Sequence, residues 1–305
     1  MQLRRWLRRD ATSIERRRVA HFGRRLLNDL PAALADGAIY LAYQPKLRLR
    51  TGEIEAVEAL VRWQHPEFGP IDREILIPLI ETHGYIGELT LWVLRRALAD
   101  QQRLTERGCL LGFYINVSAG LLIDSAFVRE ICELTDPRLG RIGLEITETV
   151  LIENSALALA NLKQLSRHGI AISIDDYGSG LSSLAYLRDL PAQELKIDKM
   201  FISGMTTSHR DPLIVRSTID LAHALDLQVV AEGVESPAAL ALLRVMGCDY
   251  AQGFLISPAL AIDGLEQFLT AYVPNLGSGS VTMTPPPGFW RRTTSEPNAP
   301  AAATG

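Results

Sequence analysis

Residues 170–198 read IAISIDDYGSGLSSLAYLRDLPAQELKID, and this stretch indicates how the chain folds. It begins with a short apolar run (170–176) and ends with another (194–198), and aspartate closes both runs. Short apolar runs of this kind predict strands that are buried on both faces. The glycines and serines between them suit a turn followed by the cap of a helix.

The same pattern repeats along the chain. Further strand candidates are residues 38–44, 54–63, 111–117, 141–147, 227–232 and 249–254, and helical patterns occupy 89–104, 155–169, 211–225 and 236–247. Such alternation predicts an α/β fold with a mainly parallel sheet. About eight strands favour a TIM (β/α)8 barrel, and an open doubly wound sheet is the alternative. The link 46–53 carries no helical pattern, so we expect the first strand to pair with the second as an antiparallel hairpin.

The two ends of the chain differ from its centre in composition. Residues 1–25 contain nine arginines and two acidic residues, a local charge of +7, which leaves −11 for the other 280 residues of a chain with net charge −4. This start predicts a helical linker or docking segment over 1–30, for an upstream sensor domain, a partner or an anionic membrane surface. Residues 274–305 are rich in Gly, Pro, Ser and Thr, which predicts a disordered tail. The acidic core, 31–273, argues against double-stranded nucleic acid as a partner.

The cysteines and the apolar residues narrow the class of protein further. The chain is 47% hydrophobic, which is enough for a sizeable core. No apolar stretch approaches the roughly 18–20 residues that a membrane-spanning helix needs. Cys109, Cys132 and Cys248 are widely spaced and show no zinc-binding pattern. We therefore expect a cytoplasmic protein.

Polar residues occupy the ends of strands that should be apolar. They are Glu58, Asn116, Glu145, Asp175, Asp176, Lys196, Asp198, Glu232 and Gln252. In a barrel the C-terminal strand ends converge on one face, where active sites form. Converging carboxylates repel one another unless a cation neutralises them, and oxygen ligands without cysteine or paired histidine favour Mg²⁺ or Mn²⁺.

The adjacent aspartates suggest more than one ion. One of Asp175 and Asp176 can bridge two ions while its neighbour holds the second, as two-metal phosphoester hydrolysis requires. A metal-dependent enolase-type barrel also carries strand-end carboxylates together with a lysine base. Residue spacing alone leaves both chemistries open.

At these residues the sequence resembles the EAL-type cyclic di-GMP phosphodiesterase domain over roughly residues 35–270. The matching segments are AYQPKLRLRTGEIEAVEALVRW, YINVSA, LEITET, SIDDYGSGLSSLAYL, LKIDKMFI, VVAEGVE and CDYAQGF. The resemblance implies a modified TIM barrel with an antiparallel first strand. It also implies hydrolysis of cyclic di-GMP to linear pGpG with two Mg²⁺ or Mn²⁺ ions, which lowers a second messenger in bacterial signalling.

The resemblance also implies roles for individual residues. The metal ligands that it implies are Glu58, Asn116, Glu145, Asp175, Asp176 and Glu232. Lys196 is expected to contact the attacking water or the developing charge. Glu232 can accept the proton of the water, and the alternative is that two metals lower the pKa of the water enough that no dedicated base is required. The expected substrate contacts are Gln44, Leu60, Arg62, Asp198, Glu235 and Gln252.

The loop after Asp176 is expected to organise the metal site and a homodimer interface. The residues implied there are Glu148, Gly178, Ser179 and Gly180, together with the neighbouring helix. An ordinary strand-to-helix turn is the simpler interpretation of the loop. A catalytically silent cyclic di-GMP receptor is the competing function, but such members typically lose metal ligands or the lysine, and none is lost here.

Overall fold

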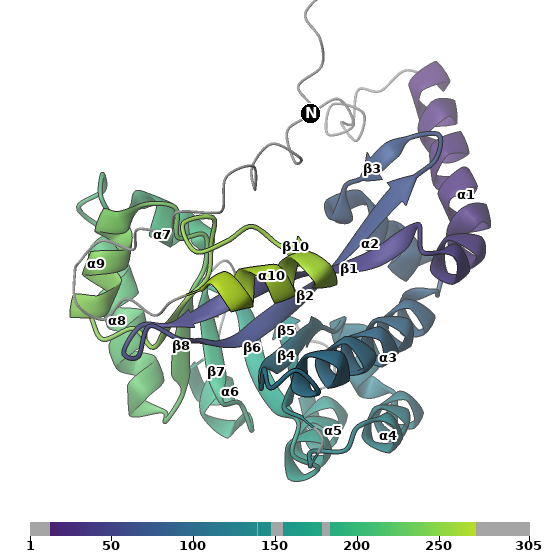
Figure 1. Ribbon diagram of the computed structural model, residues 1–305. Helices are drawn as coiled ribbons and strands as arrows, with labels where there is room; N and C mark the ends of the chain where they lie inside the picture. The colour runs from purple at the N-terminus through teal and green to yellow at the C-terminus, as the bar shows by residue number, and fades with distance from the viewer. Residues whose placement is uncertain (1–12, 139, 148–154, 179–183, 273–305) are drawn as a thin grey trace, which may run out of the picture.

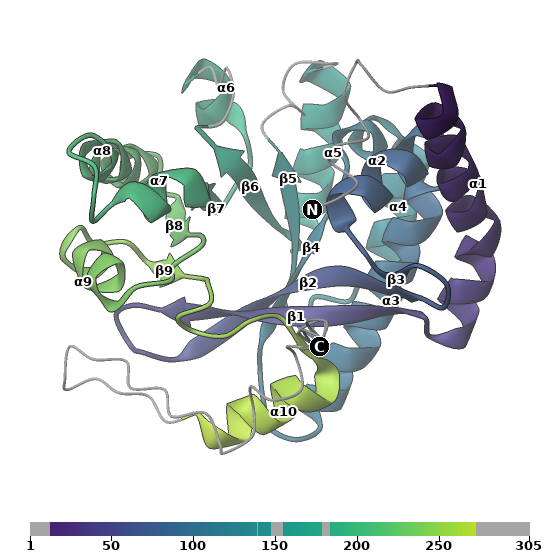
Figure 2. The same cartoon turned by 90° about the horizontal axis from the view of Figure 1, so that it is seen from above.

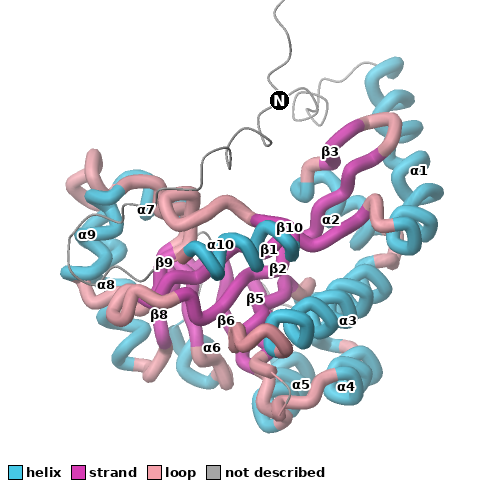
Figure 3. Tube along the Cα trace, in the orientation of Figure 1, coloured by secondary structure: helices cyan, strands magenta, loops and turns pink. Residues whose placement is uncertain are grey.

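The computed structural model describes residues 13–138, 140–147, 155–178 and 184–272. Strands form a central barrel, and helices surround it (Figures 1 and 3). This arrangement is the modified TIM barrel that the sequence predicts. No helix within the described ranges is long and apolar enough to cross a membrane.

Among the described residues, eight strands close the barrel. They are β1 (Ile39–Arg48), β2 (Ile54–His65), β4 (Gly112–Asn116), β5 (Ile142–Thr147), β6 (Ala171–Tyr177), β7 (Glu194–Ile197), β8 (Gln228–Ala231) and β9 (Tyr250–Ala251). Strand β1 is antiparallel to both β2 and β9, and the other neighbours run parallel. Two short strands, β3 (Gly69–Ile71) and β10 (Leu260–Ala261), pair with β2 and β1 outside the closure.

The first two strands form the predicted hairpin. Their register pairs Gln44 with Glu58 and extends over nearly the whole length of β1. The turn between them is tight, because the amide of Gly52 donates to the carbonyl of Arg48 at 2.8 Å. Gly52 has φ +72°, a conformation that glycine adopts at little cost. A turn this short leaves no room for a crossover helix, so β1 must run antiparallel to β2.

Helices cover the outside of the barrel, as Figure 2 shows from above. They are α1 (Ser13–Asp36), α2 (Arg73–Thr82), α3 (Ile86–Thr105), α4 (Ser125–Leu134), α5 (Ser155–Arg167), α6 (Leu184–Asp189), α7 (Lys199–Gly204), α8 (Asp211–Ala224), α9 (Pro237–Val245) and α10 (Ile262–Ala271), with a 3₁₀ turn at Ala119–Ile123. Strand residues that face these helices are fully buried, among them Phe113, Leu144 and Val229. Burying each such side chain contributes about 1.5–3 kcal/mol to folding.

Helix α1 crosses the boundary that composition suggests at residue 30. Leu26, Leu30 and Ala33 on this helix are buried in the apolar core. Oδ2 of Asp29 lies 3.1 Å from Nε2 of His65 on β2. The C-terminal half of α1 is therefore packed against the barrel, while residues 1–12 lie outside the described part of the chain.

Candidate functional site

A cavity of about 760 Å³ opens at the C-terminal ends of the parallel strands. Twelve of the predicted site residues line it: Gln44, Glu58, Leu60, Asn116, Glu145, Asp175, Asp176, Lys196, Asp198, Glu232, Glu235 and Gln252. The strand register brings several of them together, because Asn116 lies beside Glu145 and Thr147 lies beside Asp175. Parallel strands thus carry residues that are distant in sequence to one rim.

The backbone at the end of β6 turns two consecutive aspartates toward the cavity. The pairing of β6 with β7 shifts register between Ile174 and Tyr177. Asp176 has φ +56°, and its amide donates to Oδ1 of Asp175 at 3.0 Å. In a regular strand neighbouring side chains point to opposite faces, so this irregularity is what allows both carboxylates to face the same space.

Glu58 is held from two sides by amide groups. Nδ2 of Asn116 donates to its Oε1 at 2.8 Å, and Nε2 of Gln252 donates to its Oε2 at 2.6 Å. Burial alone raises the pKa of Glu58, but the charge of Lys196 and the bond from Asn116 outweigh burial and lower that pKa to about 2. Glu58 is therefore a fixed, ionised carboxylate at the rim.

The ammonium of Lys196 lies at the centre of the acidic group. Its Nζ is 2.5 Å from Glu232, 2.9 Å from Glu145, 3.0 Å from Asp175 and 3.7 Å from Glu58. The side chain is 1% exposed. Burial opposes its charge, but the surrounding carboxylates raise the pKa of Lys196 well above its usual value. The four carboxylates therefore already enclose one cation.

One ammonium does not neutralise these carboxylates. Burial, followed by the negative charge of Glu58, raises the pKa of Glu145 to about 8, although Lys196 and Lys46 act in the opposite direction. Burial is also the largest cause that raises the pKa of Glu232 to about 7. Both acids are thus desolvated first of all, and neighbouring carboxylates add repulsion that raises their pKa values further. This repulsion is the condition that a divalent cation relieves.

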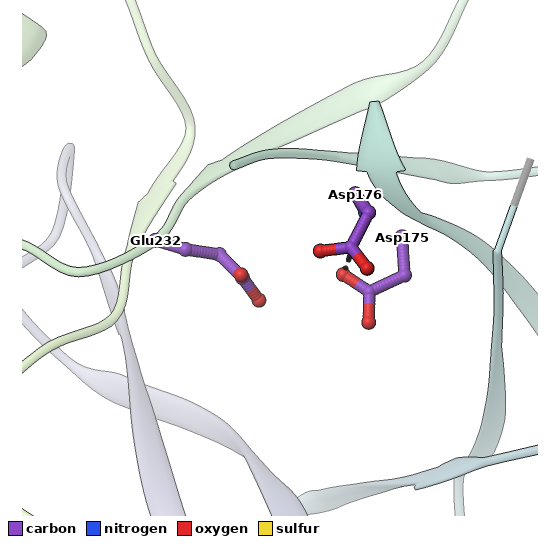
Figure 4. A group of neighbouring side chains, drawn as sticks. All are labelled: Asp175, Asp176 and Glu232. Carbon is purple, nitrogen blue, oxygen red and sulfur yellow. Dashed lines mark hydrogen bonds between the residues drawn. The ribbon is translucent and has the colours of Figure 1, made fainter. Parts of the chain in front are cut away.

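The oxygen atoms best placed for a metal belong to Asp175, Asp176 and Glu232. One ligand oxygen from each lies within 4.8 Å of the others, and Glu232 points toward the two aspartates (Figure 4). All are hard oxygen donors, which suit Mg²⁺ or Mn²⁺ better than Zn²⁺. The donor set therefore fits a divalent cation, and Glu58, Asn116 and Glu145 lie on the same rim.

Some predicted residues lie apart from this group. Arg62 does not line the cavity, and its Nη1 donates to the carbonyl of Val61 at 3.0 Å. Gly178 has φ +98°, and a Cβ atom added there meets the ring of Phe201 at 2.9 Å, so glycine suits this position. Asp198 caps α7 by accepting from the amide of Met200, but it lines the cavity and its side chain is hydrogen-bonded with Asp176. Glu148, Ser179 and Gly180 lie outside the described residues.

The structure also brings in residues that the sequence patterns did not single out as part of the site. Arg73 begins α2, lines the cavity and lies 3.9 Å from Oε1 of Glu58. Lys46 and Glu194 lie inside the barrel, where the ammonium of Lys46 donates to both Glu145 and Glu194. Lys46 stands in the alternating segment KLRLR, so an inward-facing lysine could have been suspected from the strand period of two.

Comparisons with known proteins agree with this geometry. The family model described as "EAL domain" matches residues 27–259. Cyclic di-GMP phosphodiesterase NbdA from Pseudomonas aeruginosa is 42% identical over 248 residues, which cover 80% of this chain and 32% of that protein. A second cyclic di-GMP phosphodiesterase of the same organism is 37% identical over 80% of this chain and 42% of its own length. The chain thus spans about a third to two fifths of these relatives.

Solved structures show the same fold. A structure described as "PaMucR Phosphodiesterase, c-di-GMP complex" aligns with TM-score 0.74 and 36% identity, covering 79% of this chain and 99% of that one. The EAL domain of DcpA from Mycobacterium smegmatis aligns with TM-score 0.64 and 35% identity, covering 77% and 96%. The match extends over most of the described barrel, and this chain belongs to the EAL domain family.

Proposed function

We propose that this domain hydrolyses one phosphodiester bond of cyclic di-GMP to give linear pGpG. The observation that carries the proposal is the convergence of four carboxylates on one buried cation in the cavity at the strand ends. Support comes from family membership and from a related structure whose printed description names a cyclic di-GMP complex. The full-length relatives are longer than this chain, so the input that regulates it is a separate question.

The residues around Lys196 divide into two ligand groups in this proposal. Glu58, Asn116, Glu145 and Asp175 hold one Mg²⁺ or Mn²⁺ ion, and Asp175, Asp176 and Glu232 hold a second. When bound, such ions supply Lewis-acid polarisation of phosphoryl oxygens and of the attacking water. The crowding of buried carboxylates at the rim supports this assignment, because a bound cation can take the place of the protons that Glu145 and Glu232 hold near neutral pH.

The chain's own groups orient the reaction. The ammonium of Lys196 faces the carboxylate rim, where it can donate to the water or to the charge that develops on phosphate. Glu232 accepts the proton of the water, and a pKa raised by burial suits a proton acceptor near neutral pH. Positioning of the reacting groups supplies the rest of the acceleration.

The remaining wall of the cavity contacts the substrate in this proposal. Its residues are Gln44, Leu60, Asp198, Glu235 and Gln252, which line the cavity, and Arg62, which requires a change of side-chain direction to reach it. Gln44 is already oriented by two bonds, one from Gln252 and one to the carbonyl of Ser257. Such fixed polar groups set the orientation of a bound ligand.

We further propose homodimerisation through the loop after Asp176 and helix α6, and a partner or upstream sensor for the N-terminal arginines. Most of that loop and residues 1–12 fall outside the described ranges, so both stand on the sequence. Cytoplasmic location and contact of residues 1–25 with a membrane surface stay predictions on the same basis. Light scattering of the full chain, with and without residues 1–25, tests the assembly.

The function is tested by incubating the full chain with cyclic di-GMP and Mg²⁺ or Mn²⁺, and separating the products by chromatography. We expect pGpG, and no product with a chelator. Glu58→Ala is expected to lower turnover by about 10²–10³-fold, because it removes a fixed carboxylate of the rim. Glu130→Ala on the exposed surface of α4 is the matched control and should retain full turnover. Binding of substrate without turnover in the unaltered chain would instead indicate a receptor.

A further inference from the structure

A second buried lysine lies beneath the cavity, inside the barrel. Lys46 projects from β1 two residues deeper than Gln44, its side chain is 0% exposed, and it does not line the cavity. Its Nζ lies 2.8 Å from Oε1 of Glu145 and 2.8 Å from Oε1 of Glu194. The same Nζ lies 3.6 Å from the centre of the Tyr114 ring.

This charge is costly to bury, so its presence calls for a physical reason. The inside of a TIM barrel is usually filled by branched apolar side chains. Placing an ammonium and a carboxylate there costs several kcal/mol per ion before their attraction is counted, and apolar replacements are often neutral or stabilising. Stability alone therefore does not account for a lysine at this position.

The contacts of Glu145 give that reason. Oε1 of Glu145 accepts from Lys46 below, and Oε2 accepts from Lys196 at the floor of the cavity. A carboxylate bonded at both oxygens cannot rotate without losing a buried hydrogen bond. The bond from Lys46 thus fixes which oxygen is presented to the cavity.

Lys46 is itself fixed from the opposite side. Glu194 accepts from Lys46, and the hydroxyl of Ser173 donates to the same oxygen of Glu194 at 2.7 Å. Lys46 and Glu194 together carry no net charge. They can therefore hold Glu145 in place without changing the net charge that the cavity offers to cations.

We propose that Lys46 is a positioning residue for the cation centre, which holds Oε1 of Glu145 inside the barrel so that Oε2 faces the cavity. The inference rests on the proposed function in one respect, since it assumes that Glu145 binds a metal. Partners that orient a metal ligand typically contribute about 10–100-fold to metal affinity.

The test uses two double variants of the full chain that have the same net charge. Lys46→Met with Glu194→Gln removes the donor to Glu145, and Lys46→Gln with Glu194→Gln keeps an amide donor on a side chain one bond shorter than lysine. Mn²⁺ is titrated into each metal-free protein, and free Mn²⁺ is followed by electron paramagnetic resonance. Ser173→Ala, which leaves the bond between Lys46 and Glu145 in place, is the matched control.

We expect the Met pair to bind Mn²⁺ about 10–100-fold more weakly than the unaltered chain. Ser173→Ala should stay within about threefold of it, because the bond from Lys46 to Glu145 remains, and the Gln pair should bind Mn²⁺ more tightly than the Met pair, because it keeps a donor. Equal Mn²⁺ affinity in the folded Met pair overturns the proposal. Lys46→Leu with Glu194→Leu serves as a second donor-free pair if the first does not fold. If both donor-free pairs fail to fold while the Gln pair folds, Lys46 serves the fold alone and the proposal is also overturned.

This experiment separates the inference from the proposed function, because Mn²⁺ binding needs no substrate. Normal Mn²⁺ binding without hydrolysis of cyclic di-GMP counts against the function and leaves the role of Lys46 standing. Absence of Mn²⁺ binding in the unaltered chain overturns both.

Discussion

Two buried lysines share one carboxylate, and their surroundings differ in charge balance. Lys196, at the cavity floor, has four carboxylates within 4.0 Å, whereas Lys46, one layer deeper, has two and an aromatic ring. Glu145 belongs to both groups. We call Lys196 and the four carboxylates around it the upper layer, and Lys46 with Glu194 and Glu145 the lower layer. Carboxylates outnumber the ammonium group by four to one in the upper layer and by two to one in the lower layer. The proposals above assign the two layers different roles, a support for Glu145 in the lower one and a cation site in the upper one.

The pKa values of the carboxylates in the upper layer reflect how crowded and buried they are. The pKa values of Glu145 and Glu232 are raised to about 8 and about 7, with burial as the largest cause of each shift. Glu58, which has two amide donors, is the exception in the same group. A metal that binds to such acids must displace the protons that they hold at neutral pH.

Removing the upper lysine should have the largest effect. Lys196→Met leaves four carboxylates around an apolar side chain, so we expect the metal-free protein to lose about 3–5 kcal/mol of stability. Turnover should fall about 10³-fold, because the ammonium proposed to stabilise the reacting phosphate is gone. Denaturant unfolding and product chromatography measure the two losses.

The response to metal tells whether the upper layer is a cation site or a simple ion pair. A cation that takes over the charge of Lys196 should raise the melting temperature of the Met variant more than that of the unaltered chain. Equal shifts on addition of Mn²⁺ would show that the carboxylates do not gather cations, and the comparison between the layers would fail.

A change of pH should alter the stability of the protein less than Lys196→Met does. In the metal-free fold Glu145 and Glu232 bind protons up to about pH 8 and pH 7, whereas their unfolded value is 4.5. The folded state therefore holds more protons than the unfolded chain between these limits, and stability decreases as pH rises from about 5 to about 8. The lowered pKa of Glu58 acts only near pH 2–4.5 and does not affect this window.

Urea unfolding at pH 5.5 and 8.5 in the presence of a chelator measures this decrease. Saturating Mg²⁺ should reduce it, because a metal replaces the protons. Glu232→Gln should make this decrease in stability smaller, since one of the two titrating groups is gone. A metal-free protein that becomes more stable toward pH 8.5 contradicts the raised pKa values of Glu145 and Glu232.

The residues of the upper layer stand out in the sequence, whereas in the lower layer the strand period points at most to Lys46 and not to its partners. Glu58 and Asp175 interrupt or end apolar runs, which marks them as residues at a functional rim. The first strand was expected to end at residue 44, but β1 continues to Arg48 and carries Lys46 inward. Its partners Glu145 and Glu194 lie 99 and 148 residues away, so only closure of the barrel brings them together.

Helix α2 illustrates a second limit of the sequence patterns. Pro78 lies inside this helix, and proline in a helical interior normally argues against a helix. Asp72 stabilises the start of the helix as its N-cap, by accepting from the amide of Glu74. Arg73 therefore reaches the cavity from an element that periodicity did not predict, whereas most barrel strands were predicted to within a few residues.

The smallest effect should come from a buried polar pair outside both layers. The hydroxyl of Tyr43 donates to Asp100 of α3 at 2.6 Å, which links β1 to the outer ring of helices. Tyr43→Phe removes this donor, but Asp100 keeps its bond from Arg96 at 3.0 Å. We therefore expect a loss of only about 1 kcal/mol in the free energy of unfolding.

Turnover and Mn²⁺ affinity of Tyr43→Phe should stay at the values of the unaltered chain, because Tyr43 does not line the cavity. Its neighbour Gln44 faces the opposite side of β1, since side chains alternate along a strand. Loss of turnover in the folded variant would show that the outer face of β1 acts on the site through Gln44 and Lys46. The barrel wall would then couple its two faces, and the support of Glu145 could not be assigned to the lower layer alone.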